Sequence, residues 1–377
     1  EDALQKARII DNYDDMTDIS IINCPYLPEL TNTRLDGVSI KELNLFAKRV
    51  TILSENEVIA LNGIFLNQNA QGKYDDGILD ALGLPPEIFG ETVNPGETIG
   101  ILKDGTATEC GLPLGIPVIA AACHDTASAV TAVPCPEEDF VFISCGTWSL
   151  LGTELDSPIV NDKAYEWGFS NEGMPEKKIK LLRNIMGLWI IQECRNYRLK
   201  RGEKLSFDDM ERAASESAPF RSFIDVEDDR FANPENMENE IKAYCRETGQ
   251  PVPESLGETL RCAYESLAMK YRYSVEKLEQ LTGKIFSAIH IIGGGCRDKL
   301  LCGFTADASG KNVVAGPAEA TALGNGINQF IGLGVIASVA EGREILRRSI
   351  GTESYTPRNK ESWDKAYSVY LKVTGQG

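Results

Sequence analysis

Between residues 115 and 150, short apolar segments alternate with polar and glycine turns, which constrains the fold of this 377-residue chain more than any other feature. Residues 117–122 form an apolar run that predicts a buried strand. The small residues after the polar turn 124–126 predict a short helix, and residues 141–144 predict a second strand. Strands and helices in alternation are typical of an α/β fold.

Two chemically distinctive groups follow these strands. Asp125 stands just after the first strand, and α/β proteins place ligand crevices at the carboxyl ends of their strands. Gly146 beside Thr147 follows the second strand and suits a backbone that approaches a phosphate closely. One carboxylate and one phosphate turn predict a phosphoryl-transfer site. The structural alternative for Asp125 is a helix N-cap.

The composition narrows the possible partners. The chain has 38 basic and 56 acidic residues, a net charge of −18, which argues against nucleic acid or an anionic membrane as partner. No apolar run approaches the ~20 residues of a membrane-spanning helix. Ten cysteines without a CxxC pair and only two histidines argue against zinc. We expect a cytoplasmic protein with reduced thiols. The sequence does not decide whether Cys245 and Cys262 form one disulfide.

A run of three glycines lies near the C-terminal third of the chain. Residues 286–292 predict a buried strand, and Gly293, Gly294 and Gly295 separate it from a helix expected to begin at Lys299. Such a turn exposes amide N–H groups at the positive end of a helix, where a nucleotide phosphate can bind. Tight packing between the strand and the helix is the alternative.

The segment after the Gly-Thr turn reads as two strands and a helix. Residues 165–171 and 177–182 predict strands that flank a loop at 171–173. We expect Asn184 to open the following helix, with Gln192 on the same face as its apolar residues.

Two further helices carry distinctive patterns. Residues 254–281 predict a long helix whose apolar stripe we assign to the core rather than to a cofactor. Residues 318–330 predict a helix that contains Gly324 and Gly326, each of which lowers helix stability by about 1 kcal/mol relative to alanine. These glycines indicate a close approach of another backbone or a ligand.

Five segments then occur in a recognisable order: CHDTASAV, SCGTWSLLG, LLRNIMGLW, IIGGGCRDKLL and AGPAEATALGN. Together they resemble the FGGY carbohydrate kinases from about Tyr74 to the end of the chain, and NIMGLW with HDTASAV is similar to the branch that acts on L-rhamnulose. The resemblance implies the α/β fold of actin-like ATPases, two RNase-H-like lobes with ATP and sugar between them. Residues 1–114 would be a partial N-terminal lobe with a connecting segment, and residues 115–377 a complete C-terminal lobe.

The resemblance also implies a reaction, transfer of the γ-phosphate of Mg-ATP to the 1-hydroxyl of L-rhamnulose, with Asp125 as general base. The sugar would be bound by His124, Asp125, Thr126 and Asn184. The ATP would be bound by Thr147, Gln192, Gly293, Gly294 and Gly295, with Gly295 beside the adenosine. We expect no metal ligand from the protein, because Mg²⁺ in such sites is held largely by phosphates and water. The expected partners are the sugar and ATP, for a monomer or a homodimer.

Two departures from the family pattern stand out. The family begins with a phosphate loop of the form DxGxTxxR, which this sequence lacks, and only about half of the expected residues precede Asp125. We expect the sequence to be part of a longer protein, and the alternative is a truncated, non-catalytic sugar- or nucleotide-binding module. Within the family, a kinase for L-fuculose or xylulose is the other alternative. Asp298 replaces an expected asparagine and would add negative charge near the nucleotide.

Overall fold

The computed structural model describes residues 34–35, 38–39, 93–122, 124–135 and 139–376. The chain divides into two compact units, Glu1–Thr92 and Val93–Gly377. In the first unit, strands β1 (Arg34–Leu35) and β2 (Val38–Ser39) form an antiparallel pair. Most of the expected partial lobe lies outside the described residues, so its boundary at residue 114 stays a prediction.

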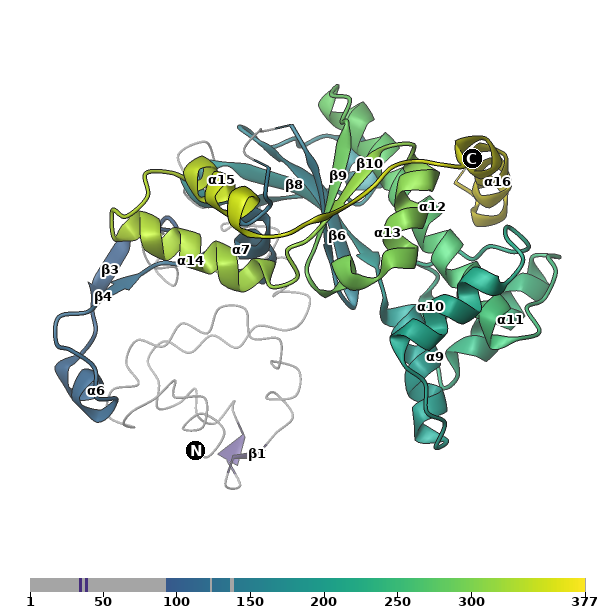
Figure 1. Cartoon of the computed structure of the whole chain (residues 1–377), viewed down its shortest axis with the longest axis horizontal. Coiled ribbons are helices and arrows are strands. Elements are labelled where there is room, and N and C mark those ends of the chain that lie inside the picture. The colour runs from purple at the N-terminus through teal and green to yellow at the C-terminus, as the bar shows by residue number, and fades with distance from the viewer. Residues whose placement is uncertain (1–33, 36–37, 40–92, 123, 136–138, 377) are drawn as a thin grey trace. The chain divides into compact units, whose positions relative to one another are not determined.

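A seven-stranded sheet organises the second unit (Figure 1). Its strand order is β11-β10-β9-β5-β6-β8-β7, in which β5, β9 and β10 run parallel and every other neighbouring pair is antiparallel. The carboxyl ends of the three parallel strands therefore meet at one edge, where α/β sheets bind their ligands. The strands are β5 (Val141–Cys145), β6 (Trp148–Leu155), β7 (Ser170–Gly173), β8 (Ile179–Met186), β9 (Ala288–Ile292), β10 (Asn312–Ala315) and β11 (Glu353–Tyr355).

Helices cover both faces of this sheet, as buried parallel strands require. On one face, Val141 and Ile143 of β5 share a core with α9, α10, α11, α12 and α13. On the other face, Phe142 packs in a second core with α7, α14 and α15 (Figure 1). The helices are α6 (Asp104–Glu109), α7 (Asp125–Thr131), α8 (Asp162–Glu166), α9 (Trp189–Lys200), α10 (Phe207–Glu216), α11 (Met237–Glu247), α12 (Leu256–Thr282), α13 (Lys299–Ser309), α14 (Ala320–Gly332), α15 (Val339–Ser349) and α16 (Lys360–Thr374). Short 3₁₀ turns occupy Pro175–Lys177, Asp229–Phe231 and Gly294–Arg297.

The long helix α12 confirms the prediction for residues 254–281. It begins at a capping box formed by Ser255 and Glu258 and ends at Gly283, whose φ of 69° provides a left-handed C-terminal cap. Every residue of the predicted stripe is buried in the core: Leu260, Tyr264, Leu267, Tyr271, Val275 and Leu278.

Three predictions between residues 115 and 190 are wrong in detail. The run 117–122 gives only a three-residue strand, β4 (Pro117–Ile119), which pairs with β3 (Thr98–Ile101) rather than with the large sheet. Its residue Val118 is exposed, because a two-stranded ribbon leaves one face uncovered. The expected loop 171–173 belongs to strand β7, since its residues pair with β8, and part of the expected strand 165–171 is helix α8.

Asn184 does not open a helix. It lies in strand β8, directly opposite Leu150 of β6, and the helix begins only at Trp189. Ile185 and Leu188 are three residues apart, a spacing that fits a helix by itself. Pairing along the whole length of β6 outweighs this local preference and extends the strand to Met186.

Gly324 and Gly326 have different surroundings although they share helix α14. A Cβ at Gly324 would lie 1.7 Å from the main-chain oxygen of Ser128, so Gly324 lets α14 pack directly against the backbone of α7. A Cβ at Gly326 would meet nothing within 4 Å among the described residues. The expected close approach of another backbone is thus confirmed for Gly324, whereas at Gly326 no described residue makes one and the approach of a ligand stays a prediction.

This difference predicts opposite effects of one substitution. We expect Gly324→Ala to lower the free energy of unfolding by about 1–3 kcal/mol, because the two helices must separate to accommodate a methyl group. Gly326→Ala is the matched control and should raise stability by up to about 1 kcal/mol through its helix propensity. Urea unfolding of both variants measures the difference, and equal effects would refute the packing role of Gly324.

Candidate active site

Asp125 is the first residue of helix α7 and not its N-cap. The cap residue is His124, whose backbone is extended and whose side chain makes no capping hydrogen bond. Asp125 Oδ1 accepts hydrogen bonds from the amide of Thr126, at 2.6 Å, and from its hydroxyl, at 3.3 Å. The Asp125 side chain is 78% exposed. Within the described part of the chain, each of its hydrogen bonds and ion pairs ends on Oδ1, which leaves Oδ2 open.

A buried arginine fixes the opposite end of helix α7. Arg343 of α15 donates to the main-chain oxygens of Val130, at 3.0 Å, and Thr131, at 3.2 Å. The same guanidinium forms a two-pronged ion pair with Glu154 of β6. Both charged side chains are at least nine-tenths buried. Arg343 therefore adds donors to two carbonyl groups of the last turn of α7, of which the Val130 oxygen also accepts from the amide of Val133.

Three polar side chains meet next to Asp125. Glu172 of β7 and Lys180 of β8 are cross-strand neighbours, with Lys180 Nζ 2.5 Å from Glu172 Oε2. His124 Nδ1 lies 3.1 Å from that carboxylate oxygen and 3.1 Å from Lys180 Nζ. The other ring nitrogen, Nε2, lies 3.5 Å from Asp125 Oδ1. The sequence indicated His124 and Asp125 but not Glu172 or Lys180, because the strand pairing that joins them was read as a loop.

The charges of this cluster shift two pKa values. Burial by itself would raise the pKa of Glu172, but the hydrogen bond with His124 and the charge of Lys180 outweigh it and lower that pKa to about 2. Burial lowers the pKa of Lys180, and the attraction of Glu172 opposes this. Glu172 is consequently an ionised carboxylate at neutral pH.

The shift at Glu172 predicts how stability depends on pH. Its folded pKa of about 2 lies below its ordinary value of 4.5, so the unfolded chain binds the proton first as the pH falls. We expect Glu172→Gln to be less stable than the wild type by about 3 kcal/mol above pH 5, and this difference to disappear as the pH falls to about 2. Urea midpoints across this range measure it. Glu361→Gln, at an exposed ion pair with Lys365, should show no such difference.

The other predicted sugar ligands lie nearby on the same helix and sheet. The Thr126 side chain is buried, and its hydroxyl is directed to Asp125. Asn184 is exposed on the same face of β8 as Lys180, four residues or roughly 13 Å further along the strand. His124, Asp125 and Thr126 are thus in contact, whereas Asn184 is further along the same surface.

The predicted phosphate turn joins β5 to β6 and is tied to helix α9. Thr147 accepts at its main-chain oxygen from the amides of Gly187 and Trp189, each at 3.1 Å. Its hydroxyl, Oγ1, donates to Gln192 Oε1 at 3.1 Å. The fold therefore brings together Thr147 and Gln192, two residues that the sequence predicted to contact ATP.

The glycine turn after β9 packs against the end of β5. A Cβ at Gly295 would lie 2.2 Å from Cys145 Sγ, and one at Gly293 would lie 3.0 Å from the Cys145 main-chain oxygen. Gly293 also has a positive φ of 79°. Gly294 is exposed and would meet nothing within 4 Å among the described residues. Gly295 thus fits the packing alternative, and Gly294 is the member of the turn that faces solvent.

The start of helix α13 does not offer free amides as expected. Asp298 is its N-cap and accepts from Leu301 N at 2.9 Å, while the amide of Leu300 donates to Glu211 at 3.3 Å. The hydroxyl of Tyr264 also donates to Asp298, at 2.7 Å. Burial raises the pKa of Asp298. Asp298 is thus a partly buried N-cap whose carboxylate is held by Leu301 and Tyr264, and its expected effect on a nucleotide stays a prediction.

A hollow of about 440 Å³ opens beside the glycine turn. The surface of its lining is mostly apolar and includes Ala315, Pro317, Leu323 and Ile350, together with Cys296, which follows the glycine turn. Four charged side chains also line it: Arg297, Lys299, Glu319 and Glu353. It lies at the carboxyl ends of β9 and β10. A mostly apolar hollow of this volume suits a planar organic ring system.

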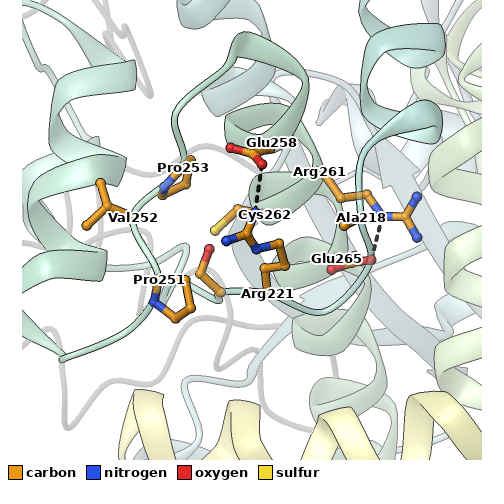
Figure 2. A pocket seen from close by; sticks show the side chains of 10 residues that line it. Ala218, Arg221, Pro251, Val252, Pro253, Glu258, Arg261, Cys262 and Glu265 are labelled. Carbon is orange, nitrogen blue, oxygen red and sulfur yellow. Dashed lines mark hydrogen bonds and ion pairs between the residues drawn. The ribbon is translucent and has the colours of Figure 1, made fainter.

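A second pocket, between helix α12 and the segments 218–222 and 251–253, is far smaller. Its volume of about 10 Å³ has room for about one water molecule (Figure 2). It is lined by Cys262 and by two ion pairs, Arg221–Glu258 and Arg261–Glu265. The thiol of Cys262 donates to Cys245, which lowers the pKa of Cys245 and raises that of Cys262. The two cysteines are thus in contact as free thiols, without the disulfide that the sequence left open.

In the part of the chain that the structure describes, no group of three or more His, Cys, Asp or Glu side chains could hold a metal ion. None of the helices described is long and apolar enough to cross a membrane.

Comparison with protein families gives two matches. Residues 141–333, a little over half of the chain, match the C-terminal domain of the FGGY family of carbohydrate kinases, and residues 63–132 match its N-terminal domain. The chain belongs to the FGGY family of carbohydrate kinases. The resemblance seen in the sequence is thereby confirmed.

Two similar curated proteins are rhamnulokinases. The chain is 45% identical over 309 residues to the rhamnulokinase of Bacteroides thetaiotaomicron and covers 62% of that protein with 82% of its own length. It is 43% identical over 290 residues to the rhamnulokinase of Halalkalibacterium halodurans, with 60% of that protein and 77% of this chain covered. The chain spans about three fifths of the length of these relatives.

Solved structures agree on the fold. A gluconate kinase from Lactobacillus acidophilus matches with a TM-score of 0.63 at 16% identity, over 82% of this chain and 61% of that one. A Plasmodium falciparum glycerol kinase with ADP matches with a TM-score of 0.63 at 12% identity, over 99% of this chain and 77% of that one. The α/β fold expected from the sequence is therefore the FGGY sugar-kinase fold.

Proposed function

We propose that this protein transfers the γ-phosphate of Mg-ATP to the 1-hydroxyl of L-rhamnulose. The choice of sugar rests on relatives that are 38–45% identical and are named rhamnulokinases. Membership of a carbohydrate kinase family supports ATP and a sugar as the two substrates.

The contact between helix α14 and Asp125 beside the hollow is the observation that supports phosphoryl transfer at this site. The hydroxyl of Thr321 on α14 is 3.4 Å from the main-chain oxygen of Asp125, and Glu319 and Leu323, two residues away on either side of Thr321, line the hollow. The short segment 319–323 therefore connects helix α7, which carries the exposed carboxylate of Asp125, to a hollow that suits a purine. Cys296, which directly follows the glycine turn, lines the same hollow, and the turn itself packs on Cys145, two residues before Thr147.

In the proposed reaction, Asp125 is the general base. A primary alcohol loses its proton late during phosphoryl transfer, so an ionised carboxylate within hydrogen-bond reach is sufficient. Oδ1 is held by Thr126, which leaves Oδ2 for the 1-hydroxyl. His124 and Asn184 bind the sugar. The proton passes from the 1-hydroxyl to Oδ2 as the new oxygen–phosphorus bond forms and ADP departs.

The nucleotide lies, in this proposal, along the carboxyl ends of the parallel strands. The adenosine occupies the hollow, bordered by the glycine turn with Gly294 at its surface. Thr147 and Gln192 contact the phosphates. Mg²⁺ enters with ATP as part of the substrate, held largely by phosphate oxygens and water.

An assay of ADP release tests the proposal. We expect release to require both Mg-ATP and a sugar, with kcat/KM for L-rhamnulose at least tenfold above that for L-fuculose or D-xylulose. A higher value for another ketose would overturn the choice of sugar. ATP binding without sugar-dependent ADP release for any ketose would overturn the kinase proposal in favour of a binding module.

A further inference from the structure

A buried lysine lies behind the candidate base and is outside the chemistry proposed above. The Lys180 side chain is 0% exposed, and a buried ammonium is unfavourable unless it is paired. Its partners are Glu172 Oε2, at 2.5 Å, and His124 Nδ1, at 3.1 Å. Among the described residues, Glu172 is the carboxylate within ion-pair distance of Lys180, and a second N–H of the ammonium can contact the His124 ring that faces Asp125.

The contact with Lys180 decides which nitrogen of His124 carries the proton. An ammonium group has donors and no acceptor. At 3.1 Å, His124 Nδ1 must present its lone pair to Lys180, so the proton of the neutral ring is on Nε2. Nε2 faces Asp125 Oδ1 at 3.5 Å. The opposite tautomer would set Nδ1–H against the ammonium and the Nε2 lone pair against the carboxylate, and both contacts are repulsive.

Glu172, taken alone, favours the opposite tautomer of His124. Its Oε2 is also 3.1 Å from His124 Nδ1 and could accept a proton from that nitrogen. In the intact cluster Oε2 already accepts from Lys180 at the shorter distance of 2.5 Å. Without Lys180, Glu172 would become the polar neighbour of Nδ1 in the cluster and would favour the Nδ1–H tautomer.

We propose that Lys180 is a positioning residue that holds His124 in the Nε2–H tautomer. In this form His124 donates toward Asp125 Oδ1 and leaves Oδ2 to receive the proton of the substrate hydroxyl. The effect on catalysis rests on the proposed function. The tautomer of His124 does not, and it can be measured without substrate.

Nitrogen-15 NMR of the histidine rings tests the proposal directly. The chain has only two histidines, and His124→Asn assigns their signals. In the neutral ring of His124, we expect the Nε2–H form in the wild type and a switch to Nδ1–H in Lys180→Met. Lys178→Met, at an exposed pair with Asp156 in the same segment, is the control and should keep the Nε2–H form. An Nδ1–H wild type, or no switch in Lys180→Met, overturns the proposal.

A second variant separates the contribution of Lys180 from that of Glu172, whose carboxylate remains without its cation in Lys180→Met. Glu172→Gln keeps the lysine, so Lys180 still donates to Nδ1 and the Nε2–H tautomer should persist. If Glu172→Gln alone changes the tautomer, Glu172 and not Lys180 fixes the ring, and the proposal is wrong.

Kinetics separate this inference from the proposed function. In an active kinase, Lys180→Met should lower kcat about tenfold or more and change KM for the sugar less than about threefold, as loss of a transition-state contact predicts. An unchanged kcat in a variant whose tautomer has switched would overturn the catalytic part of the proposal. A wild type that is inactive on every ketose but keeps the Nε2–H tautomer would refute the proposed function and support the assignment of the ring.

Discussion

Replacing Asp125 with asparagine should lower kcat for ADP release by about 10²–10⁴-fold, the usual contribution of a general base. Asparagine has nearly the same shape as aspartate but cannot accept the proton of the 1-hydroxyl. Its amide can still take a hydrogen bond from Thr126, so helix α7 should begin as before. Sugar binding, measured by calorimetry, should weaken only a few-fold.

The control for this variant is Asp156→Asn, the same chemical change at an exposed pair with Lys178. It should leave kcat and KM unchanged. If Asp125→Asn keeps most of the wild-type kcat, Asp125 is not the base. If it loses sugar binding in proportion to kcat, its role is to hold the sugar and not to accept a proton.

Replacing Arg343 with methionine should lower the free energy of unfolding by about 3–5 kcal/mol, because the partner Glu154 stays buried without a countercharge. The main-chain oxygens of Val130 and Thr131 in α7 also lose the hydrogen bonds that Arg343 donates. Urea unfolding measures the change. The double variant Arg343→Met with Glu154→Met should recover much of the loss, since replacing a whole buried pair with apolar groups is far less destabilising than breaking it.

The control for Arg343 lies on the same helix. Arg348→Met removes an exposed pair with Glu344 and should change stability by less than about 1 kcal/mol. Equal effects of the two variants would show that the buried pair contributes no more than an exposed one. Failure of the double variant to recover stability would show that the lost donors to α7, and not the isolated charge, dominate.

The sequence predicted the elements whose signals are local. The apolar stripe of helix α12 repeats at helical spacing along the sequence, and the structure confirms both the helix and the burial of that stripe. The apolar run of β9 followed by three glycines was equally clear. Gln192 could be predicted beside the nucleotide from the family motif, and its contact with Thr147 joins two of the predicted ligands.

The parts that sequence reasoning missed depend on pairing between distant segments. The apolar residues that follow Asn184 have a helix-like spacing, but Asn184 lies in a strand because β8 pairs with β6. Glu172 lies in a short polar segment that forms a strand because it pairs with β8, where Lys180 is its direct partner. Arg343 is one of several charged residues in an ordinary amphipathic helix, and nothing in its neighbours indicates that it alone is buried. Such residues are defined by the partners that the fold brings to them.

The contact between Gly324 and Ser128 has a consequence for how the two family domains cooperate. Helix α7 is the last helix of the segment that matches the N-terminal family domain, and α14 lies inside the segment that matches the C-terminal one. Their backbones touch without an intervening side chain, three residues from Asp125. The candidate base thus lies on a helix of one family segment that packs, backbone against backbone, on a helix of the other, so a larger side chain at Gly324 would also displace the helix that carries Asp125.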